Sequence, residues 1–361
     1  MPVSGKVIVM RDLEKTYSFH FQSKTETLRT LLEELGCADL CQSVVLSPLV
    51  GGYRNRAKFK IFGDGKHRRM KGTDPALGEV AFEDSLWILP EWGRAIVRSV
   101  DDCLGRDSVG RPVDGFELQL THGRQEGHLT LSVKPDSDGN YDELAQELLE
   151  DIKDLAGAAI PSKKKEYGKR FLRHCILGTD IFAHYTAFFQ SNLLLTPRLV
   201  ETVRSFFWGS RFRQFYDLYC GVGLFSLYLG KHAEEILGVD NSRQAVESAQ
   251  MNAKSLGFSH AQFFCTSVDV YIGKFLGNQK IGANDGVLLN PPRSGVPSPV
   301  IDAVASLGGE TICLVSCCLE THVRDLHLWQ KAGYAVESMT AFDMFPFTDF
   351  LETATLLRRD K

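Results

Sequence analysis

The sequence predicts an α/β protein whose C-terminal half forms a mostly parallel, doubly wound sheet that ends in an antiparallel hairpin. After His184, short apolar runs alternate with helical segments, which indicates parallel strands with helices on both faces. The apolar runs are 215–219, 235–240, 261–265, 286–290 and 311–318. Two closing runs, 334–342 and 351–357, have no helix between them and predict the hairpin.

The first half of the chain predicts a smaller α+β domain. Alternating apolar and polar residues at 116–120 and 128–133 are typical of antiparallel strands, and a helix is expected at 143–155. An amphipathic helix is expected at 25–36, closed by Gly36. The predicted division is an N-terminal segment 1–46, a central domain 47–182 and a C-terminal domain 183–361.

Bulk composition narrows the class of protein. Hydrophobic residues make up 43% of the 361 residues, which supports a packed core and excludes a disordered or fibrous chain. No apolar run approaches the ~18 residues of a membrane span, and the first residues do not resemble a signal peptide. We expect a cytoplasmic protein with no membrane partner. The nine cysteines contain no CxxC pair, so we expect reduced thiols, no metal and no iron–sulfur cluster.

Two basic runs predict contacts with nucleic acid. Because the net charge is −4, such a partner must be bound by local patches. The first run places four cations on one face of an extended segment: Arg54, Arg56, Lys58 and Lys60. A further basic stretch, 66–71, follows soon after. The second is 163–170, and Tyr53 and Tyr167 add stacking surfaces. Each run alone is also compatible with a solvated face, but two runs flanking one domain favour phosphate contacts.

A glycine-containing turn between a strand and a helix predicts a nucleoside-binding site. Gly221 and Gly223 allow a sharp turn and close approach of a ligand. Ser226 occupies the position where a dinucleotide fingerprint requires its third glycine, which argues against NAD. Asp240 ends the next strand, where a carboxylate accepts ribose hydroxyls or caps the helix at 242. The turn favours a nucleoside without pyrophosphate, S-adenosyl-L-methionine (AdoMet).

Reactive side chains follow three predicted strands. They are Cys317 with Cys318, Asn290 with Arg293, and Glu352. A thiolate that adds to C6 of a pyrimidine makes C5 nucleophilic, so that C5 accepts a methyl group before a base removes its proton. Singly, these residues are also explained as a buried thiol, a loop arginine and a surface carboxylate. Their placement at strand ends favours one site, and the arginine after the prolines argues against amine methylation.

Several segments resemble the RNA uracil-C5 methyltransferase family, closest in appearance to its 23S rRNA branch. They are 188–192, 217–227, 290–295, 316–326 and 343–352, together with 53–58 in the central domain. The resemblance implies a class I AdoMet-dependent methyltransferase domain with a Rossmann-like sheet. It implies Cys317 as the nucleophile and Glu352 as the base.

The resemblance also implies the binding residues. Those for AdoMet are Gln190, Tyr219, Gly221, Gly223, Asp240 and Asn290. Those for RNA and its uracil are Phe188, Asn290, Arg293, Arg54, Arg56 and Lys58. The chain departs from the family at Cys318 and Leu319, where Asn and Pro are usual, and at Phe347 and Phe350, where His is common. These departures affect the hydrogen bonding expected around the thiolate.

The combined prediction is a monomeric enzyme that methylates C5 of a specific uridine in RNA, in 23S rRNA before tRNA. The target uridine has to leave its stack to reach Cys317, so base flipping is expected. Three alternatives remain open at this stage. They are a tRNA T-loop uridine methyltransferase, a non-catalytic RNA-binding or folding factor with this fold, and an amine methyltransferase that uses Asn290.

Overall fold

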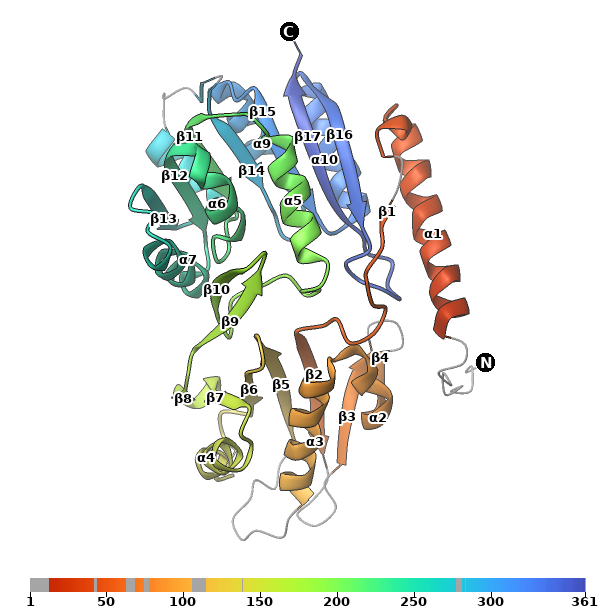
Figure 1. Ribbon diagram of the computed structural model, residues 1–361, viewed down its shortest axis with the longest axis vertical. Coiled ribbons are helices and arrows are strands. Elements are labelled where there is room, and N and C mark those ends of the chain that lie inside the picture. Colours follow the sequence, from red (N-terminus) through yellow and green to blue (C-terminus); the bar gives the residue numbers. More distant parts are fainter. Residues whose placement is uncertain are drawn as a thin grey trace. The chain divides into compact units, whose positions relative to one another are not determined.

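The computed structural model describes residues 13–41, 44–62, 69–74, 78–105, 115–137, 139–276, 281–282 and 284–360. The chain divides into two compact units (Figure 1). Unit 1 contains Met1–Ser18, Leu49–Asp180 and Gln190–Leu193. Unit 2 contains Phe19–Pro48, Ile181–Phe189 and Leu194–Lys361. Residues 19–48 therefore group with the C-terminal unit, whereas the sequence suggested a separate N-terminal segment.

Unit 2 is built on an eight-stranded sheet with the order β1-β16-β17-β15-β14-β11-β12-β13. The strands are β1 (Val44–Val45), β11 (Phe212–Leu218), β12 (Ala233–Asp240), β13 (Ala261–Cys265), β14 (Gly286–Leu289), β15 (Thr311–Ser316), β16 (Tyr334–Phe342) and β17 (Glu352–Arg359). Strands β11 to β15 are parallel, and β17 runs antiparallel to β15 and β16. The predicted parallel strands and terminal hairpin are confirmed. Strand β1, which pairs with β16, was not predicted.

Helices cover both faces of this sheet. They are α1 (Leu13–Glu34), α5 (Thr196–Phe206), α6 (Leu224–Leu229), α7 (Arg243–Ser255), α8 (Val268–Tyr271), α9 (Ser298–Leu307) and α10 (Leu319–Lys331), with short turns η2 (Ala38–Leu40), η6 (Gly230–His232) and η7 (Ile272–Leu276). One apolar cluster joins α1, α8, α9 and α10 to the strands. In Figure 1, α5 and α6 lie in front of the sheet and α9 and α10 behind it.

Unit 1 has its own sheet, with the order β4-β3-β2-β5-β6-β7-β8. Its strands are β2 (Arg56–Phe62), β3 (Arg69–Asp74), β4 (Gly78–Ala81), β5 (Phe116–His122), β6 (Gly127–Ser132), β7 (Leu155–Ile160) and β8 (Lys165–Gly168). Its helices and turns are α2 (Phe82–Ser85), η4 (Leu86–Ile88), α3 (Glu91–Gly105), α4 (Tyr141–Asp151) and η5 (Pro161–Lys163). The helix expected at 143–155 ends at Asp151, because Leu155 already begins β7.

The chain passes from unit 1 to unit 2 through a two-stranded sheet of β9 (Phe171–Ile176) and β10 (Thr179–His184). The antiparallel strands predicted at 116–120 and 128–133 correspond to β5 and β6. In the part of the chain that the structure describes, no helix has the length and apolar character needed to cross a bilayer.

A buried carboxylate joins the start of β11 to the segment before β14. Asp285 is 1% exposed and lies 2.7 Å from the guanidinium of Arg213. Its two oxygens also accept backbone N–H groups from Gln214, at 3.0 Å, and Gly282, at 2.7 Å. Asp285 therefore holds the amino ends of two neighbouring strands together.

Replacing this carboxylate tests its contribution to stability. In Asp285→Asn, one oxygen becomes an N–H donor that faces other donors, so we expect the free energy of unfolding to fall by about 1–3 kcal/mol. Urea denaturation measures this loss. The control is Glu337→Gln, which removes an exposed ion pair with Arg358 and should cost about 0.5 kcal/mol or less. Equal losses in the two variants would contradict the role of Asp285.

Candidate active site

The sheet of unit 2 brings the predicted reactive residues to one edge. Strands β11, β12, β14 and β15 are parallel, so their carboxyl ends meet at that edge. Strand β17 is antiparallel to β15 and begins there with Glu352. Ligands of open α/β sheets bind outside the carboxyl ends of the strands. The edge is therefore the candidate active site.

Cys317 directly follows β15 and lies near Glu352, the first residue of the neighbouring strand β17. Ser316 is paired with Thr353 in the antiparallel β15–β17 register. Extending that register by one residue brings Cys317 opposite Glu352, and residues directly opposite have Cβ atoms about 4.5–5.5 Å apart. Glu352 is held on its other side by pairing with Phe342. Strand pairing thus fixes Glu352 and the residue that precedes Cys317.

Burial keeps both groups protonated near neutral pH. The pKa of Cys317 is raised to about 11, first by burial and then by the nearby Glu352. Arg293 opposes this shift in pKa with its charge and with a hydrogen bond to the thiol. Glu352 is 3% exposed, and burial raises its pKa to about 8. Perturbed pairs of this kind are typical of acid–base sites.

The loop after β14 presents Arg293 to the thiol. Its guanidinium carbon lies 3.8 Å from the centroid of the Phe350 ring, a cation–π contact. The backbone of the loop is tied to α10, because the Thr321 hydroxyl donates to the Arg293 carbonyl at 3.0 Å and Arg324 donates to the Ser294 carbonyl at 2.8 Å. Arg293 is therefore held both at its backbone carbonyl and at its guanidinium.

The second thiol has different surroundings. Cys318 precedes α10, and its Sγ donates to Glu320 Oε2 at 3.0 Å. This hydrogen bond contributes to lowering the pKa of Glu320. Cys318 is therefore bound to a carboxylate of its own helix, whereas Cys317 faces Glu352 and Arg293. The two thiols are chemically distinct.

The turn after β11 has the backbone conformation that a cofactor turn needs. Tyr219, Gly221 and Gly223 have positive φ angles of 70°, 54° and 81°. The Gly221 N–H donates to Asp240 Oδ2 at 2.9 Å, and the Ser242 N–H donates to Asp240 Oδ1 at 2.8 Å. The side chain of Ser242 caps α7. Asp240 therefore braces the turn as well as the start of the helix.

The residues of this turn fit a nucleoside cofactor. Asp217 is fully buried, and its Oδ2 accepts from the backbone N–H and the hydroxyl of Ser226 at 3.0 and 2.5 Å. Its Oδ1 has no hydrogen-bond partner within the described ranges, although it is buried. A Cβ added to Gly221 would meet no atom within 4 Å. The turn thus combines open space with a buried acceptor, and burial raises the pKa of Asp217 to about 6.

The remaining predicted residues fall into two groups. Asn290 lies beside the cofactor turn, with its N–H donating to the Leu218 carbonyl at 3.1 Å, and Phe188 is exposed in unit 2. Gln190 belongs to unit 1, where its carbonyl accepts from Asn55 at 2.9 Å. Its assignment to the cofactor stays a prediction.

The basic face expected on unit 1 is only partly available. Lys58 is exposed, but Arg56 is half-buried and its pKa is lowered by burial. Lys60 is paired with Glu79 at 3.2 Å. Arg54 is half-buried, and its backbone forms an isolated antiparallel β-bridge with Asn192. Residues 66–68 of the following run lie outside the described residues.

The stacking role is contradicted for Tyr53 and stays a prediction for Tyr167, whose ring is partly exposed. Tyr53 is 2% exposed and belongs to the apolar core of unit 1, so the prediction that its ring stacks on a base is wrong. The Tyr167 hydroxyl donates to Asp142 at 2.8 Å. Both rings are held by the protein itself.

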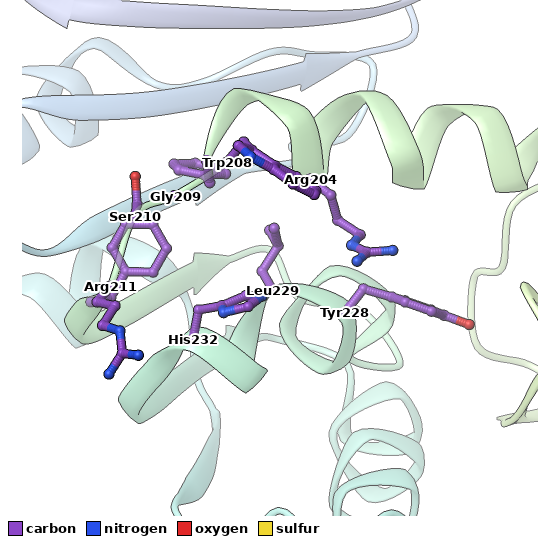
Figure 2. A pocket seen from close by; sticks show the side chains of 10 residues that line it. Arg204, Trp208, Gly209, Ser210, Arg211, Tyr228, Leu229 and His232 are labelled. Carbon is purple, nitrogen blue, oxygen red and sulfur yellow. The ribbon is translucent and has the colours of Figure 1, made fainter.

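One pocket lies away from the predicted site. It is lined by residues at the end of α5, the turn before β11 and the end of α6, among them Arg204, Trp208, Arg211, Tyr228 and His232 (Figure 2). It contains none of the predicted site residues. It lies near the amino end of β11, whereas the reactive groups follow the carboxyl ends of the strands. We assign it no role.

Sequence reasoning missed a buried lysine beside the site. Lys24, on α1, is 3% exposed and its Nζ lies 2.6 Å from Asp343 Oδ1. A signal was present, because Lys24 falls in register with the buried Leu28 and Leu32 on the apolar stripe of the helix. A cation on such a stripe requires a buried partner.

The fold and the candidate site together define an AdoMet-dependent methyltransferase. A family model described as tRNA (Uracil-5-)-methyltransferase matches residues 176–360, just over half of the chain. The chain belongs to this family. It is therefore an enzyme of the AdoMet-dependent RNA uracil-C5 methyltransferase class.

Individual relatives act on different RNAs. The 23S rRNA (uracil(747)-C(5))-methyltransferase of Vibrio vulnificus is 33% identical over 183 residues, 50% of this chain and 46% of that protein. The tRNA (uracil(54)-C(5))-methyltransferase of Pyrococcus furiosus is 26% identical over 358 residues, 95% of this chain and 81% of that protein. The crystal structure of Pyrococcus abyssi tRNA (uracil-54, C5)-methyltransferase in complex with S-adenosyl-L-homocysteine shares the fold, with a TM-score of 0.70, 22% identity and coverage of 94% and 83% of the two chains.

The raised pKa of Glu352 predicts a pH-dependent stability difference. The folded state holds a proton up to about pH 8, whereas an ordinary glutamate releases it near pH 4.5. Wild-type stability therefore falls, relative to Glu352→Gln, as pH rises through this window. We expect the variant to gain more melting temperature over the wild type at about pH 9 than at about pH 5. Equal gains at both pH values would contradict a buried, protonated carboxyl.

Proposed function

We propose that this enzyme methylates C5 of a uridine in 23S rRNA, with Cys317 as the nucleophile and Glu352 as the base. The observation that carries the assignment of roles is the β15–β17 register, which brings these two side chains opposite each other at the carboxyl edge of the sheet. Addition followed by elimination requires a nucleophile within reach of C6 of the uracil and a base within reach of C5.

Addition of the thiolate activates the uracil ring. Cys317 releases its proton to solvent, its Sγ forms a bond to C6, and the electrons of the C5–C6 double bond move into an enolate at C4–O4. The carbon C5 then becomes nucleophilic enough to accept a methyl group. Arg293 favours the thiolate form, because its charge and hydrogen bond lower the pKa of Cys317 against the effect of burial.

Elimination restores the aromatic product. Glu352, as a carboxylate, takes the C5 proton, the C5–C6 double bond forms again, and the Sγ–C6 bond breaks. The raised pKa of Glu352 makes it a stronger base than an exposed glutamate once it is ionised.

The cofactor is held by the turn after β11. The backbone of Gly221 and Gly223 approaches the ligand, and Asp240 accepts the ribose hydroxyls with the lone pairs that its two backbone contacts leave free. AdoMet supplies an electrophilic methyl group on its sulfonium. Asn290 borders this turn and lies three residues before Arg293. We assign its side chain to the edge of the uracil ring.

The choice of 23S rRNA rests on the sequence of the catalytic unit. The Asn290-Pro-Pro-Arg293 motif resembles the rRNA branch, and the rRNA-modifying relative from Vibrio has the higher identity, 33%, over half of the chain. The second candidate substrate is tRNA, because the tRNA-modifying relative from Pyrococcus furiosus aligns over 95% of the chain.

Trapping with a modified substrate tests the nucleophile. In RNA that carries 5-fluorouridine, C5 has no proton for Glu352 to remove, so the methylated adduct on Cys317 should persist. We expect an AdoMet-dependent covalent complex on a denaturing gel with the wild type and with Cys318→Ala, and none with Cys317→Ala. Loss of the complex in Cys318→Ala but not in Cys317→Ala would show that Cys318, and not Cys317, is the nucleophile. Absence of a complex with every RNA offered would contradict catalysis.

A transcript comparison tests the RNA. We expect the enzyme to introduce 5-methyluridine into unmodified 23S rRNA and to leave an unmodified tRNA transcript at least about tenfold less methylated, which corresponds to 1.4 kcal/mol of discrimination. Mass spectrometry of nuclease fragments locates the product. Preferential methylation of the tRNA would replace rRNA by tRNA without changing the roles of Cys317 and Glu352.

A further inference from the structure

The segment that leads into the catalytic strand β17 is organised around a buried lysine. Residues 343–351 connect β16 to β17, and Glu352 follows directly. Lys24, from α1 of the same unit, is 3% exposed, and its ion-pair partner Asp343 is fully buried. A charge removed from water in this way is costly unless its surroundings supply compensating contacts.

The Lys24 ammonium gathers four acceptors from this one segment. Its Nζ donates to Asp343 Oδ1 at 2.6 Å and to the carbonyls of Phe345 at 3.1 Å, Thr348 at 3.0 Å and Phe350 at 3.4 Å. Three of the acceptors are backbone carbonyls spaced along the connection. Because an ammonium has three N–H donors, the four acceptors use its full donor capacity and two of them share one N–H. Lys24 therefore fixes the path of the backbone rather than one side chain.

Two further contacts from the N-terminal region hold the same connection. The His20 ring, one helical turn before Lys24, lies 6.2 Å from the ring of Phe347 in an edge-to-face arrangement. Phe347 has a positive φ of 63°, a conformation that costs energy in a non-glycine residue and needs support from its surroundings. The Asp343 N–H donates to the Val45 carbonyl at 2.9 Å, beside the β1–β16 pairing.

The connection reaches the nucleophile through Phe350. Its carbonyl accepts from Lys24, and its ring lies under the guanidinium of Arg293, 3.8 Å from the guanidinium carbon. Arg293 in turn hydrogen-bonds the thiol of Cys317. A continuous series of contacts thus runs from Lys24 through Phe350 to Arg293, whose charge lowers the pKa of Cys317.

We propose that Lys24 is a positioning residue for methyl transfer, which holds the connection 343–350 in the conformation that seats Phe350 against Arg293 beside Cys317. This inference rests on the proposed function of Cys317 and adds to it a role for the N-terminal helix. Lys24 does not touch the substrate. It acts through the backbone that carries Phe350 and leads into Glu352.

The first variants remove the cation without removing the packing. Lys24→Met keeps most of the aliphatic stem, and Lys24→Met/Asp343→Asn also removes the carboxylate that would otherwise be buried without a cation. We expect kcat to fall about 10- to 100-fold in both variants, because small displacements of reacting groups have effects of this size. The Kd for AdoMet should change by less than about twofold, a difference below 0.5 kcal/mol, because Asp240 braces the turn after β11 and Lys24 binds the connection.

Asp285→Asn is the matched control. It weakens the ion pair between the buried Asp285 and the half-exposed Arg213 of unit 2, at the amino ends of the strands. Measured below its melting temperature, its kcat should stay within about twofold of the wild type. A loss of kcat in Asp285→Asn equal to that in Lys24→Met would assign the effect of Lys24 to stability and overturn the proposal.

A double-mutant cycle tests the route through Phe350. Phe350→Leu removes the ring over Arg293 but keeps the carbonyl that Lys24 binds. If both residues act on Arg293, Lys24→Met/Phe350→Leu should lose little more activity than the worse single variant, whereas Asp285→Asn and Phe350→Leu should combine additively. Additive losses for Lys24→Met and Phe350→Leu would show that Lys24 does not act through Phe350.

Amide hydrogen exchange separates this inference from the proposed function. Exchange across 343–350 should be faster in Lys24→Met than in the wild type and unchanged in Asp285→Asn. If the wild type methylates no RNA, the proposed function fails, and unchanged exchange in Lys24→Met would independently overturn the role of Lys24. An active wild type together with wild-type kcat in Lys24→Met would overturn the inference alone.

Discussion

The antiparallel insertion of β17 between β15 and β16 is the constraint on which the active site depends. It places the start of one strand beside the end of another, so that Glu352 lies opposite Cys317. Strand pairing fixes these two positions through many backbone hydrogen bonds. The chemistry of addition and elimination therefore relies on the register of a sheet rather than on a flexible loop.

The same insertion buries Glu352 and partly buries Cys317, and so sets their proton affinities. Desolvation is the first cause of the raised pKa of Glu352 and of Cys317. The proximity of Glu352 raises the pKa of Cys317 further. Arg293 is the opposing influence on the thiol, and its position depends on the ring of Phe350. The common His of the family is absent at 347 and 350. Here two phenylalanines occupy these places, one over the arginine and one against His20.

Much of unit 2 could be predicted from the sequence, because its apolar runs and helix caps are local signals. Cys317 and Glu352 could be placed at strand ends in the same way. Their alignment across β15 and β17 could not, because register is a property of the folded sheet. Lys24 was missed because its partner, Asp343, is 319 residues away in the chain. Tyr53 was misjudged because a tyrosine before a basic strand gives no sign of whether its ring joins the core.

The most direct test of the pairing between Cys317 and Glu352 uses Glu352→Gln with ordinary, unmodified RNA. Without the base, addition and methyl transfer proceed but elimination stalls. Intact-mass spectrometry should therefore find the variant bound covalently to its RNA through Cys317, with the methyl group already on the uracil. A variant that turns over like the wild type, or a covalent complex that lacks the methyl group, would contradict Glu352 as the base of the elimination step.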